Sequence, residues 1–358
     1  MSHLLTANNL SELIGNTDLV KINSLSELTG HDIYVKCEFQ NPGGSIKDRA
    51  ALQMVLDAIE SGELKPGMTI VEGTAGNTGI GLAIVAKSLG FDIKVVMPKG
   101  QTKEKEQMIE LHGAELILVD PVPFANENHF YHTARRIAEE QPNHWWANQF
   151  ENTSNAKAHF TTTGPEIYQQ TNQHIDVFVS AAGTGGTLGG ISKYLKQQNS
   201  DIKIVSIDPD SSGIFNFLTQ GNHIASQGSS FTEGIGIMRL VSNFKEAQID
   251  YALNLPDKDI VTVADYVRKQ DAIVLGSSSA LNVCAAFYAA LKLKNDRVEQ
   301  KQIIVTIACD LGERSISKLY NSEFLISNGI IAEQQNIEQL KTKYLTEKDK
   351  LQAVCFGF

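Results

Sequence analysis

The chain has 358 residues, of which 42% are hydrophobic and 20% are charged, a balance typical of a globular protein with enough apolar side chains for two ordinary domains. Its 31 lysines and arginines against 41 aspartates and glutamates give a formal net charge of −10, and no basic cluster reverses this locally, so we expect no nucleic-acid partner. No segment approaches the roughly 18 apolar residues of a membrane span, and the N-terminus lacks the basic and apolar regions of a secretory signal, so we expect no membrane partner.

The first half of the chain alternates between predicted helices and short strands. A turn, NPGGS at 41–45, leads into a segment in which Ala51, Val55 and Ile59 have helical spacing and Gly62 is the expected stop. β-branched strands are predicted over 69–72, 93–98 and 114–120, and helices over 78–90 and 103–113. Strands that alternate with helices of this length indicate βαβ units, and hence an α/β fold with a parallel sheet.

The second half of the chain repeats this alternation. Strands are predicted over 177–183, 202–208 and 302–310, with one helix that ends near 195 and another from about 279 to 295. The stretch from about 210 to 260 is rich in Gly, Ser and Asn, and its sequence predicts no definite element. Beyond Asn321 the chain turns polar, and this tail is compatible with a docking helix or with a loose extension.

A glycine-rich turn, AAGTGGTLGG at 181–190, joins one predicted strand to the following helix. Ligands of open α/β sheets bind at such carboxyl ends of strands. The glycines can present several backbone N–H groups to one phosphate, helped by the positive end of the helix dipole. A dinucleotide pattern G-x-G-x-x-G would need glycine where Leu188 stands, although Asp208 does follow at the end of the next strand, so a nicotinamide dehydrogenase is a weaker alternative.

A second glycine-rich turn, VEGTAGNTGIG at 71–81, also lies between a predicted strand and a helix. Thr74, Asn77 and Thr78 offer side-chain donors there, beside glycines that leave the backbone open. This set suits a small carboxylate or a ring hydroxyl. Taken alone, the turn is better explained as an Asn/Gly turn with a threonine N-cap.

Sequence patterns of other kinds of site are missing. The chain contains no G-x-S-x-G, no H-E-x-x-H and no G-x-x-x-x-G-K-[ST] motif. Its four cysteines, Cys37, Cys284, Cys309 and Cys355, are far apart and form no C-x-x-C pair. We therefore expect reduced core thiols, no metal and a cytoplasmic location.

Four motifs, in their order and at their separations, resemble one family. They are NPGGSIKDR from 41, TAGNTGIGLA from 74, GTGGT from 183 and GSSSA from 276. Together they resemble the cysteine synthase and cystathionine β-synthase group of pyridoxal-phosphate enzymes, of fold type II, over roughly residues 10–320. The resemblance implies two open, twisted, mostly parallel sheets flanked by helices. It also implies a smaller domain over 40–155 with the substrate-carboxylate loop, a larger domain over 10–39 and 156–320 with the phosphate loop, and a C-terminal extension over 321–358.

The resemblance assigns the residues that would hold the cofactor. Lys47 is expected to be the Schiff-base lysine and the general base for the substrate α-proton. It must therefore be held close to the cofactor and be partly desolvated. We expect the two glycines before it to leave room for the cofactor ring. Asn77 is expected to bond the ring 3′-oxygen and Ser278 the pyridine nitrogen, with Ser277 and Ser279 near enough to leave this register open. The residues expected to hold the phosphate are Gly183, Thr184, Gly185, Gly186 and Thr187.

The same resemblance assigns a substrate site. The loop over 74–78 and Gln149 are expected to bind the substrate carboxylate, and Gly234 of TEGIG to border the substrate amine. The loop residues are Thr74, Ala75, Gly76, Asn77 and Thr78. Ala75 departs from the family pattern, because cysteine synthases usually carry serine there. We expect this to weaken substrate binding rather than abolish the chemistry.

The activity implied is a β-replacement that makes L-cysteine from O-acetyl-L-serine and sulfide through an aminoacrylate intermediate, in a homodimer. A cysteine desulfhydrase or a cystathionine β-synthase acting on the same intermediate is the first alternative. A catalytically silent homologue is a further one, although an intact Lys47, Asn77 and GTGGT loop argue against it. The chain is too short for the paired C-terminal regulatory modules of animal cystathionine β-synthases.

Overall fold

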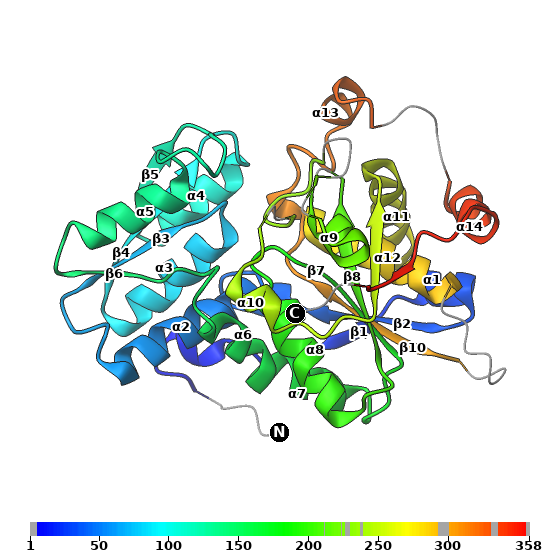
Figure 1. Cartoon of the computed structure of the whole chain (residues 1–358), viewed down its shortest axis with the longest axis horizontal. Helices are drawn as coiled ribbons and strands as arrows, with labels where there is room; N and C mark the ends of the chain where they lie inside the picture. The colour runs from blue at the N-terminus through cyan, green and yellow to red at the C-terminus, as the bar shows by residue number, and fades with distance from the viewer. Residues whose placement is uncertain are drawn as a thin grey trace.

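The computed structural model describes residues 6–210, 212–222, 224–225, 230–236, 239–292, 301–330 and 336–355. Within these ranges the strands form two sheets, each flanked by helices (Figure 1). No helix in the described part of the chain is long and apolar enough to cross a membrane. The predicted α/β class with open, mostly parallel sheets is confirmed.

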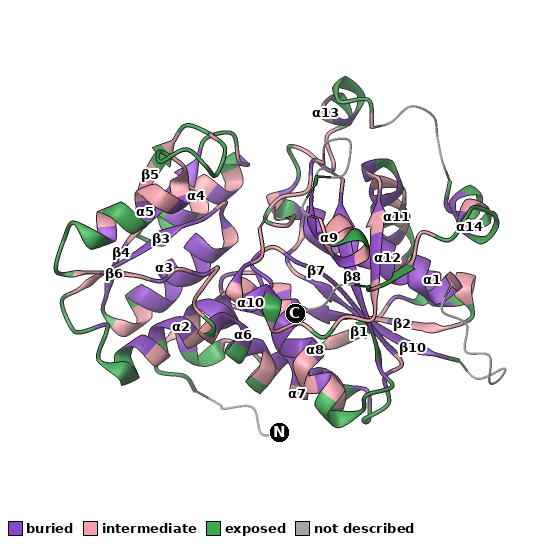
Figure 2. Cartoon of the chain, in the orientation of Figure 1, coloured by how far each residue is buried: buried purple, intermediate pink, exposed green. Residues whose placement is uncertain are grey.

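The larger sheet has seven strands, of which the central five are parallel and the two edge strands antiparallel. In spatial order they are β1 (Leu19–Lys21), β2 (Asp32–Cys37), β10 (Ile303–Ala308), β7 (Val177–Ala181), β8 (Lys203–Pro209), β9 (Tyr251–Leu255) and β11 (Gln352–Ala353). Every residue of β7 is buried, because helices cover both faces of the sheet (Figure 2). The strand sequences VFVSA of β7 and IIVTIA of β10 are almost wholly apolar because both faces of these strands are covered.

The smaller sheet has four parallel strands. Their order is β5 (Glu115–Val119), β4 (Asp92–Pro98), β3 (Thr69–Gly73) and β6 (His144–Trp146). It lies on the left in Figure 1, with α2 (Lys47–Ser61), α3 (Asn77–Leu89), α4 (Lys103–Leu111) and α5 (Phe130–Glu139) around it.

The helices around the larger sheet include several that the sequence did not predict. The helices on this side are α1 (Asn23–Thr29), α6 (Ser154–Ala158), α7 (Gly164–Gln170), α8 (Gly186–Gln198), α9 (Ile214–Gln220), α10 (Ser242–Lys245), α11 (Asp257–Asp271) and α12 (Ser277–Lys292). Of these, α8 and α12 correspond to the two helices predicted for the second half of the chain. Short 3₁₀ turns lie at Leu10–Leu13, Glu38–Gln40 and Gly312–Arg314, and a π-helical turn at His159–Thr163. The predicted extension of α12 toward 295 falls partly outside the described residues.

The C-terminal tail contains a docking helix. After α13 (Ser322–Ser327), helix α14 (Ile337–Thr346) buries Leu340 and Tyr344 against α11 and α12. The Tyr344 hydroxyl and the Lys343 ammonium both bond the buried carboxylate of Asp259 on α11, at 3.1 Å and 2.9 Å. Of the cysteines, Cys37 and Cys284 are buried as expected, whereas Cys355 in this tail is exposed and is not a core thiol.

Candidate active site

A cavity of about 240 Å³ gathers the residues that the sequence assigns to cofactor and substrate. It lies at the carboxyl ends of strands such as β3, β7 and β10, where open α/β sheets bind their ligands. The predicted residues that line it are Lys47, Thr74, Ala75, Gly76, Asn77, Thr78, Gln149, Gly183, Thr184, Gly185, Thr187, Gly234 and Ser278. Gly186 is the exception, because it begins α8 behind the loop and packs against the Asn155 side chain.

Lys47 is the first residue of α2, and its turn is tied to the end of β10. The Ile46 N–H donates to the Cys309 carbonyl at 3.0 Å, and Ser45 forms a bridge with Asp310. Burial lowers the pKa of the Lys47 ammonium below its ordinary value, and the charge of Asp310 opposes this shift. No hydrogen bond or ion pair of the Lys47 ammonium occurs among the described residues, which leaves its nitrogen open to the cavity.

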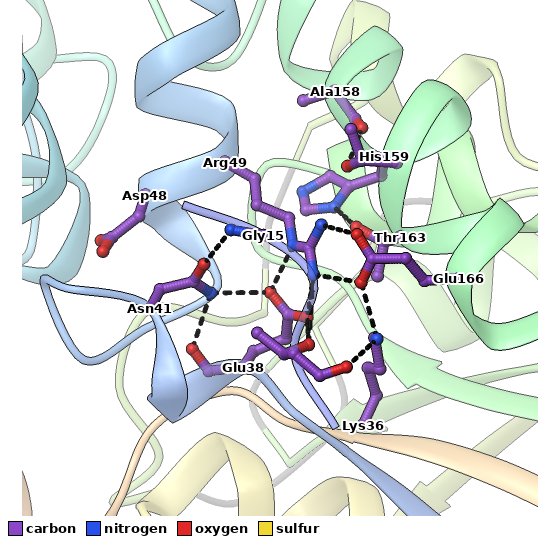
Figure 3. Close-up of polar contacts among 12 residues, drawn as sticks. Gly15, Lys36, Glu38, Asn41, Asp48, Arg49, Ala158, His159, Thr163 and Glu166 are labelled. Atoms are coloured by element: carbon purple, nitrogen blue, oxygen red, sulfur yellow. Dashed lines mark hydrogen bonds and ion pairs between the residues drawn. The ribbon is translucent and has the colours of Figure 1, made fainter. Parts of the chain in front are cut away.

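A buried ion network fixes the helix turn that carries Lys47 (Figure 3). Arg49 donates to both oxygens of Glu38, at 2.7 Å and 2.8 Å, and to both oxygens of Glu166, each at 2.7 Å. Lys36 on β2 pairs with the same Glu166 at 2.6 Å. Burial alone would raise the pKa of Glu38, but the Arg49 guanidinium holds it below its ordinary value. The start of α2 is thereby joined to β2 and α7.

The two glycines before Lys47 do not border the cavity, so the expectation that they leave room for a cofactor ring is wrong. The Gly43 N–H donates to the Asp48 carboxylate at 2.5 Å, and a Cβ at this position would collide with that carboxylate. Gly44 has φ +69°, and a Cβ there would lie 2.8 Å from the Arg314 guanidinium. The glycines therefore make room for two side chains of the protein itself.

The loop over 183–187 has the form of an anion cradle. Gly185 has φ +83°, and a Cβ on it would lie 2.5 Å from the Phe244 backbone, so only glycine fits. The Thr184 hydroxyl accepts a bond from Asn155 at 2.9 Å, which leaves its own hydrogen for the cavity. The loop ends at the N-terminus of α8, whose first N–H groups lack partners within the helix. This donor set fits the phosphate of pyridoxal phosphate without any Lys or Arg.

Of the three adjacent serines, only Ser278 lines the cavity. The Ser277 hydroxyl accepts from the Glu233 N–H at 3.2 Å, and the Ser279 hydroxyl donates to the Asp310 carbonyl at 2.7 Å. The Ser278 hydroxyl hydrogen-bonds with Cys309, whose thiol burial keeps neutral by raising its pKa to about 12. The structure thus places Ser278, rather than its neighbours, where a cofactor ring would fit.

The carboxylate loop has fewer free side-chain donors than the motif suggests. Thr78 donates to the Gln149 oxygen at 2.6 Å, and the Gln149 amide nitrogen donates to Glu72 at 3.1 Å and to the Gly73 carbonyl at 3.0 Å. The Thr74 hydroxyl accepts from the loop at 3.1 Å and keeps its hydrogen. Apart from one N–H of the Asn77 amide, the donors left for a carboxylate are therefore the Thr74 hydroxyl and the first N–H groups of α3.

Several residues in the cavity wall, or bonded to residues of the wall, were missed from the sequence. Lys105 on α4 forms a buried ion pair with Glu233 of the TEGIG segment, and Lys318 pairs with the same carboxylate at 2.6 Å. Asp310 and Arg314 bond the Asn77 side chain. Lys105 and Glu233 carry no local signal, but Asp310 closes a predicted strand, and the rule that ligands gather at strand ends could have singled it out.

Similarity to known proteins identifies the family. Residues 10–310 match the family of pyridoxal-phosphate dependent enzymes. The chain is 45% identical to cysteine synthase 1 of Emericella nidulans over 327 residues, which cover 90% of this chain and 87% of that protein. The structure of O-acetylserine sulfhydrylase isoform 3 from Entamoeba histolytica superposes with a TM-score of 0.81 at 30% identity, covering 97% of this chain and 98% of that chain. A hydrogen sulfide-producing enzyme from Fusobacterium nucleatum gives a TM-score of 0.77 at 32% identity, over 86% and 99%. These matches confirm the resemblance that the four motifs carry, and the chain belongs to the family of pyridoxal-phosphate dependent enzymes.

Proposed function

We propose that this protein is a cysteine synthase that makes L-cysteine and acetate from O-acetyl-L-serine and sulfide. The observation that carries the proposal is the gathering of Lys47, the 183–187 cradle and Ser278 in one cavity, in a chain 45% identical to a cysteine synthase over 90% of its length. The bond from the substrate β-carbon to acetate breaks, a bond from that carbon to sulfur forms, and the α-proton is removed and returned.

We assign the cofactor contacts to the residues that line the cavity. Lys47 would hold pyridoxal phosphate covalently, the cradle its phosphate, Asn77 its 3′-oxygen and Ser278 its ring nitrogen. When bound, the cofactor supplies an electron sink for charge at the substrate α-carbon. Ser278 is neutral and does not favour a protonated ring as a carboxylate would, which suits departure of a β-substituent over chemistry that needs a long-lived carbanion.

The substrate contacts follow from the donors that remain free. The Thr74 hydroxyl and the N-terminal N–H groups of α3 would hold the carboxylate, supported by the positive end of the helix dipole. Gln149 and Thr78 would act by fixing the loop, and Gly234 would border the amine. Lys47 has a pKa lowered by burial, so its nitrogen is a ready base for the α-proton.

A second candidate function is net elimination from cysteine, which releases sulfide. It is favoured by Ala75, which cannot supply the hydroxyl that cysteine synthases usually carry in this loop, and by the likeness to a hydrogen sulfide-producing enzyme. A looser hold on the carboxylate would leave the reacting substrate more open to water. Cystathionine β-synthase activity on O-acetylserine would differ from cysteine synthesis only in the nucleophile.

The deciding experiment measures kcat/KM for cysteine formation from O-acetylserine and sulfide, and for sulfide release from cysteine alone. We expect cysteine formation to be faster, with sulfide release detectable. Faster sulfide release would assign the protein as a desulfhydrase. Inactivity in both assays, with cofactor bound, would favour a silent homologue.

The lysine assignment has a separate test. Borohydride should fix the cofactor covalently to the wild-type chain and not to Lys47→Ala, because the imine bond can form only at that nitrogen. Mass spectrometry of tryptic peptides reads the site directly. A Lys47→Ala chain that still carried reduced cofactor would contradict the assignment.

We further propose a smaller domain over 40–155, a larger domain over 10–39 and 156–320, and a C-terminal extension over 321–358. Separate apolar cores support this division: among the described residues, two clusters pack on the four-stranded sheet and two others on the seven-stranded sheet. We propose a homodimer in the cytoplasm. Light scattering that gave the mass of a single chain would contradict the dimer.

A further inference from the structure

The Asn77 side chain is held at both ends of its amide by residues of the opposite sheet. We infer that Asp310 and Arg314 are positioning residues, which fix the Asn77 amide so that its one free N–H points at the cofactor 3′-oxygen. The inference rests on the proposed function, because it needs pyridoxal phosphate in the cavity with its 3′-oxygen beside Asn77.

Chemistry allows this amide only one orientation. Arg314 Nη1 donates to Asn77 Oδ1 at 2.9 Å, and Asn77 Nδ2 donates to Asp310 Oδ2 at 2.7 Å. A guanidinium has only donors and an ionised carboxylate has only acceptors. Turning the amide over would set its oxygen against the carboxylate and its NH₂ against the guanidinium, so that both bonds would be lost at once.

The donor count leaves one hydrogen for the cavity. An amide nitrogen carries two hydrogens, and Asp310 takes one of those on Asn77 Nδ2. No further partner of the Asn77 side chain occurs among the described residues, and Asn77 lines the cavity. The second N–H of the amide is therefore the donor that this side chain can offer to a ring oxygen.

Both positioning residues are themselves anchored. The Asp310 N–H donates to the Ser279 hydroxyl at 3.1 Å, and its carbonyl accepts from Ser279 at 2.7 Å; Asp310 is only 4% exposed. Arg314 Nη2 donates to the Gly43 carbonyl, in the turn before Lys47.

The same cluster explains Gly44. A Cβ at this position would lie 2.8 Å from the Arg314 guanidinium and would displace it. Arg314 thus contacts both the turn that carries Lys47 and the amide of Asn77, and it fixes their relative position.

The contact also crosses the cavity. Asn77 begins α3 beside the smaller sheet, whereas Asp310 and Arg314 follow β10 of the larger sheet. The orientation of the donor for the 3′-oxygen therefore depends on α3, which carries Asn77, and on the segment after β10, which carries its two partners. If either partner is lost, the amide can rotate and its N–H is no longer fixed.

The test uses the full-length protein loaded with pyridoxal phosphate, and reads the visible absorption of the bound cofactor and its dissociation constant. A donor at the 3′-oxygen favours the ionised oxygen over the neutral hydroxyl, and these two forms absorb differently. We expect Asn77→Ala, Arg314→Ala and Asp310→Ala to shift the spectrum in the same direction and to weaken cofactor binding about tenfold or more, as for loss of a bond to a charged group. Asp310→Asn, which keeps an acceptor oxygen, should retain most of the wild-type spectrum.

A double-mutant cycle separates positioning from a general structural effect. If Arg314 acts through Asn77, adding Arg314→Ala to Asn77→Ala should leave the spectrum of Asn77→Ala unchanged. Arg268→Ala, which removes an arginine with an exposed carboxylate partner on α11, is the matched control and should keep the wild-type spectrum. Arg314→Lys covers the case in which the alanine variant does not fold, and should show the same shift because one ammonium cannot serve both acceptors.

Three outcomes distinguish the positioning role from the Asn77 assignment and from the proposed activity. Wild-type spectra and affinities for Asp310→Ala and Arg314→Lys, beside a shifted Asn77→Ala, would overturn the inference and leave the Asn77 assignment standing. An unshifted Asn77→Ala would overturn both. Absence of cysteine formation with the expected spectral pattern would refute only the proposed activity and would support the positioning role.

Discussion

Glu72, the fourth residue of β3, is a carboxyl that the fold keeps neutral. It is fully buried and forms no ion pair among the described residues, and it accepts bonds from the Gln149 backbone and side-chain nitrogens at 3.3 Å and 3.1 Å. Burial raises its pKa to about 8, and those bonds offset only part of the rise. Glu72 in turn holds Gln149, which orients Thr78 in the carboxylate loop.

A pH dependence of stability follows from this residue. Because the folded state binds the Glu72 proton more tightly than the unfolded chain does, its contribution is full below the ordinary pKa of 4.5 and is lost as the pH rises through about 8. We predict that Glu72→Gln flattens the fall of the unfolding free energy across this window, by on the order of a few kcal/mol. Urea unfolding at several pH values measures the slope. Glu139→Gln, at an exposed position, should leave the slope alone, and parallel curves for wild type and Glu72→Gln would contradict the prediction.

At the scale of elements, the junction between β7 and α8 owes its shape to Gly185. We predict that Gly185→Ala loses most of its cofactor on dialysis. The added Cβ would collide with the Phe244 backbone and displace the N–H groups of the 183–187 loop that are expected to hold the phosphate. Gly67→Ala is a matched control, because Gly67 has the same φ of +83° with nothing within 4 Å of its Cβ. Both variants pay the strain of a left-handed alanine, so only the difference between them reports on the cradle. Equal cofactor content in the two would place the phosphate elsewhere.

Helix α2 depends on the buried network at its first turn. We predict that Arg49→Leu lowers the unfolding free energy by about 3–5 kcal/mol, because it leaves two carboxylates buried without their main partner. Lys157→Ala removes a partner of Asp57 on the same helix, but this lysine is 51% exposed, and the loss should be about 1 kcal/mol or less. Urea unfolding of both variants gives the comparison. Similar losses in the two would show that the network is not specially stabilising.

For the whole molecule, the cavity joins the two sheets, so its ligand should stabilise the fold. We predict that removing the cofactor lowers Tm, and that restoring it at about a hundred times its Kd adds about 2.7 kcal/mol to the unfolding free energy. Pyridoxal without phosphate should give a smaller shift, because it leaves the 183–187 cradle unused. Differential scanning calorimetry against ligand concentration tests this, and equal shifts with both compounds would argue against the cradle.

The sequence predicted the elements whose burial is plain in the local pattern. Strands 93–98 and 302–310 correspond to β4 and β10, and helix 78–90 to α3, because each is a continuous apolar run bounded by turn residues. The stretch over 210–260 gave no prediction, yet it contains β9, whose sequence YALNL mixes polar and apolar residues. Such a strand is stabilised by its neighbours β8 and β11, and composition does not reveal those contacts.

The sequence by itself identified the family and predicted the lysine and the glycine-rich loop that line the cavity, since each lies in a short motif whose residues are neighbours in the chain. Only the tertiary structure decided what the glycines before Lys47 accommodate, which serine faces the cavity, and what holds Asn77. Asp310 and Arg314 lie 233 and 237 positions from Asn77, and they meet it because the ends of two separate sheets pack around one cavity. No local pattern encodes a contact of that kind, since its geometry is set by the packing of the whole chain.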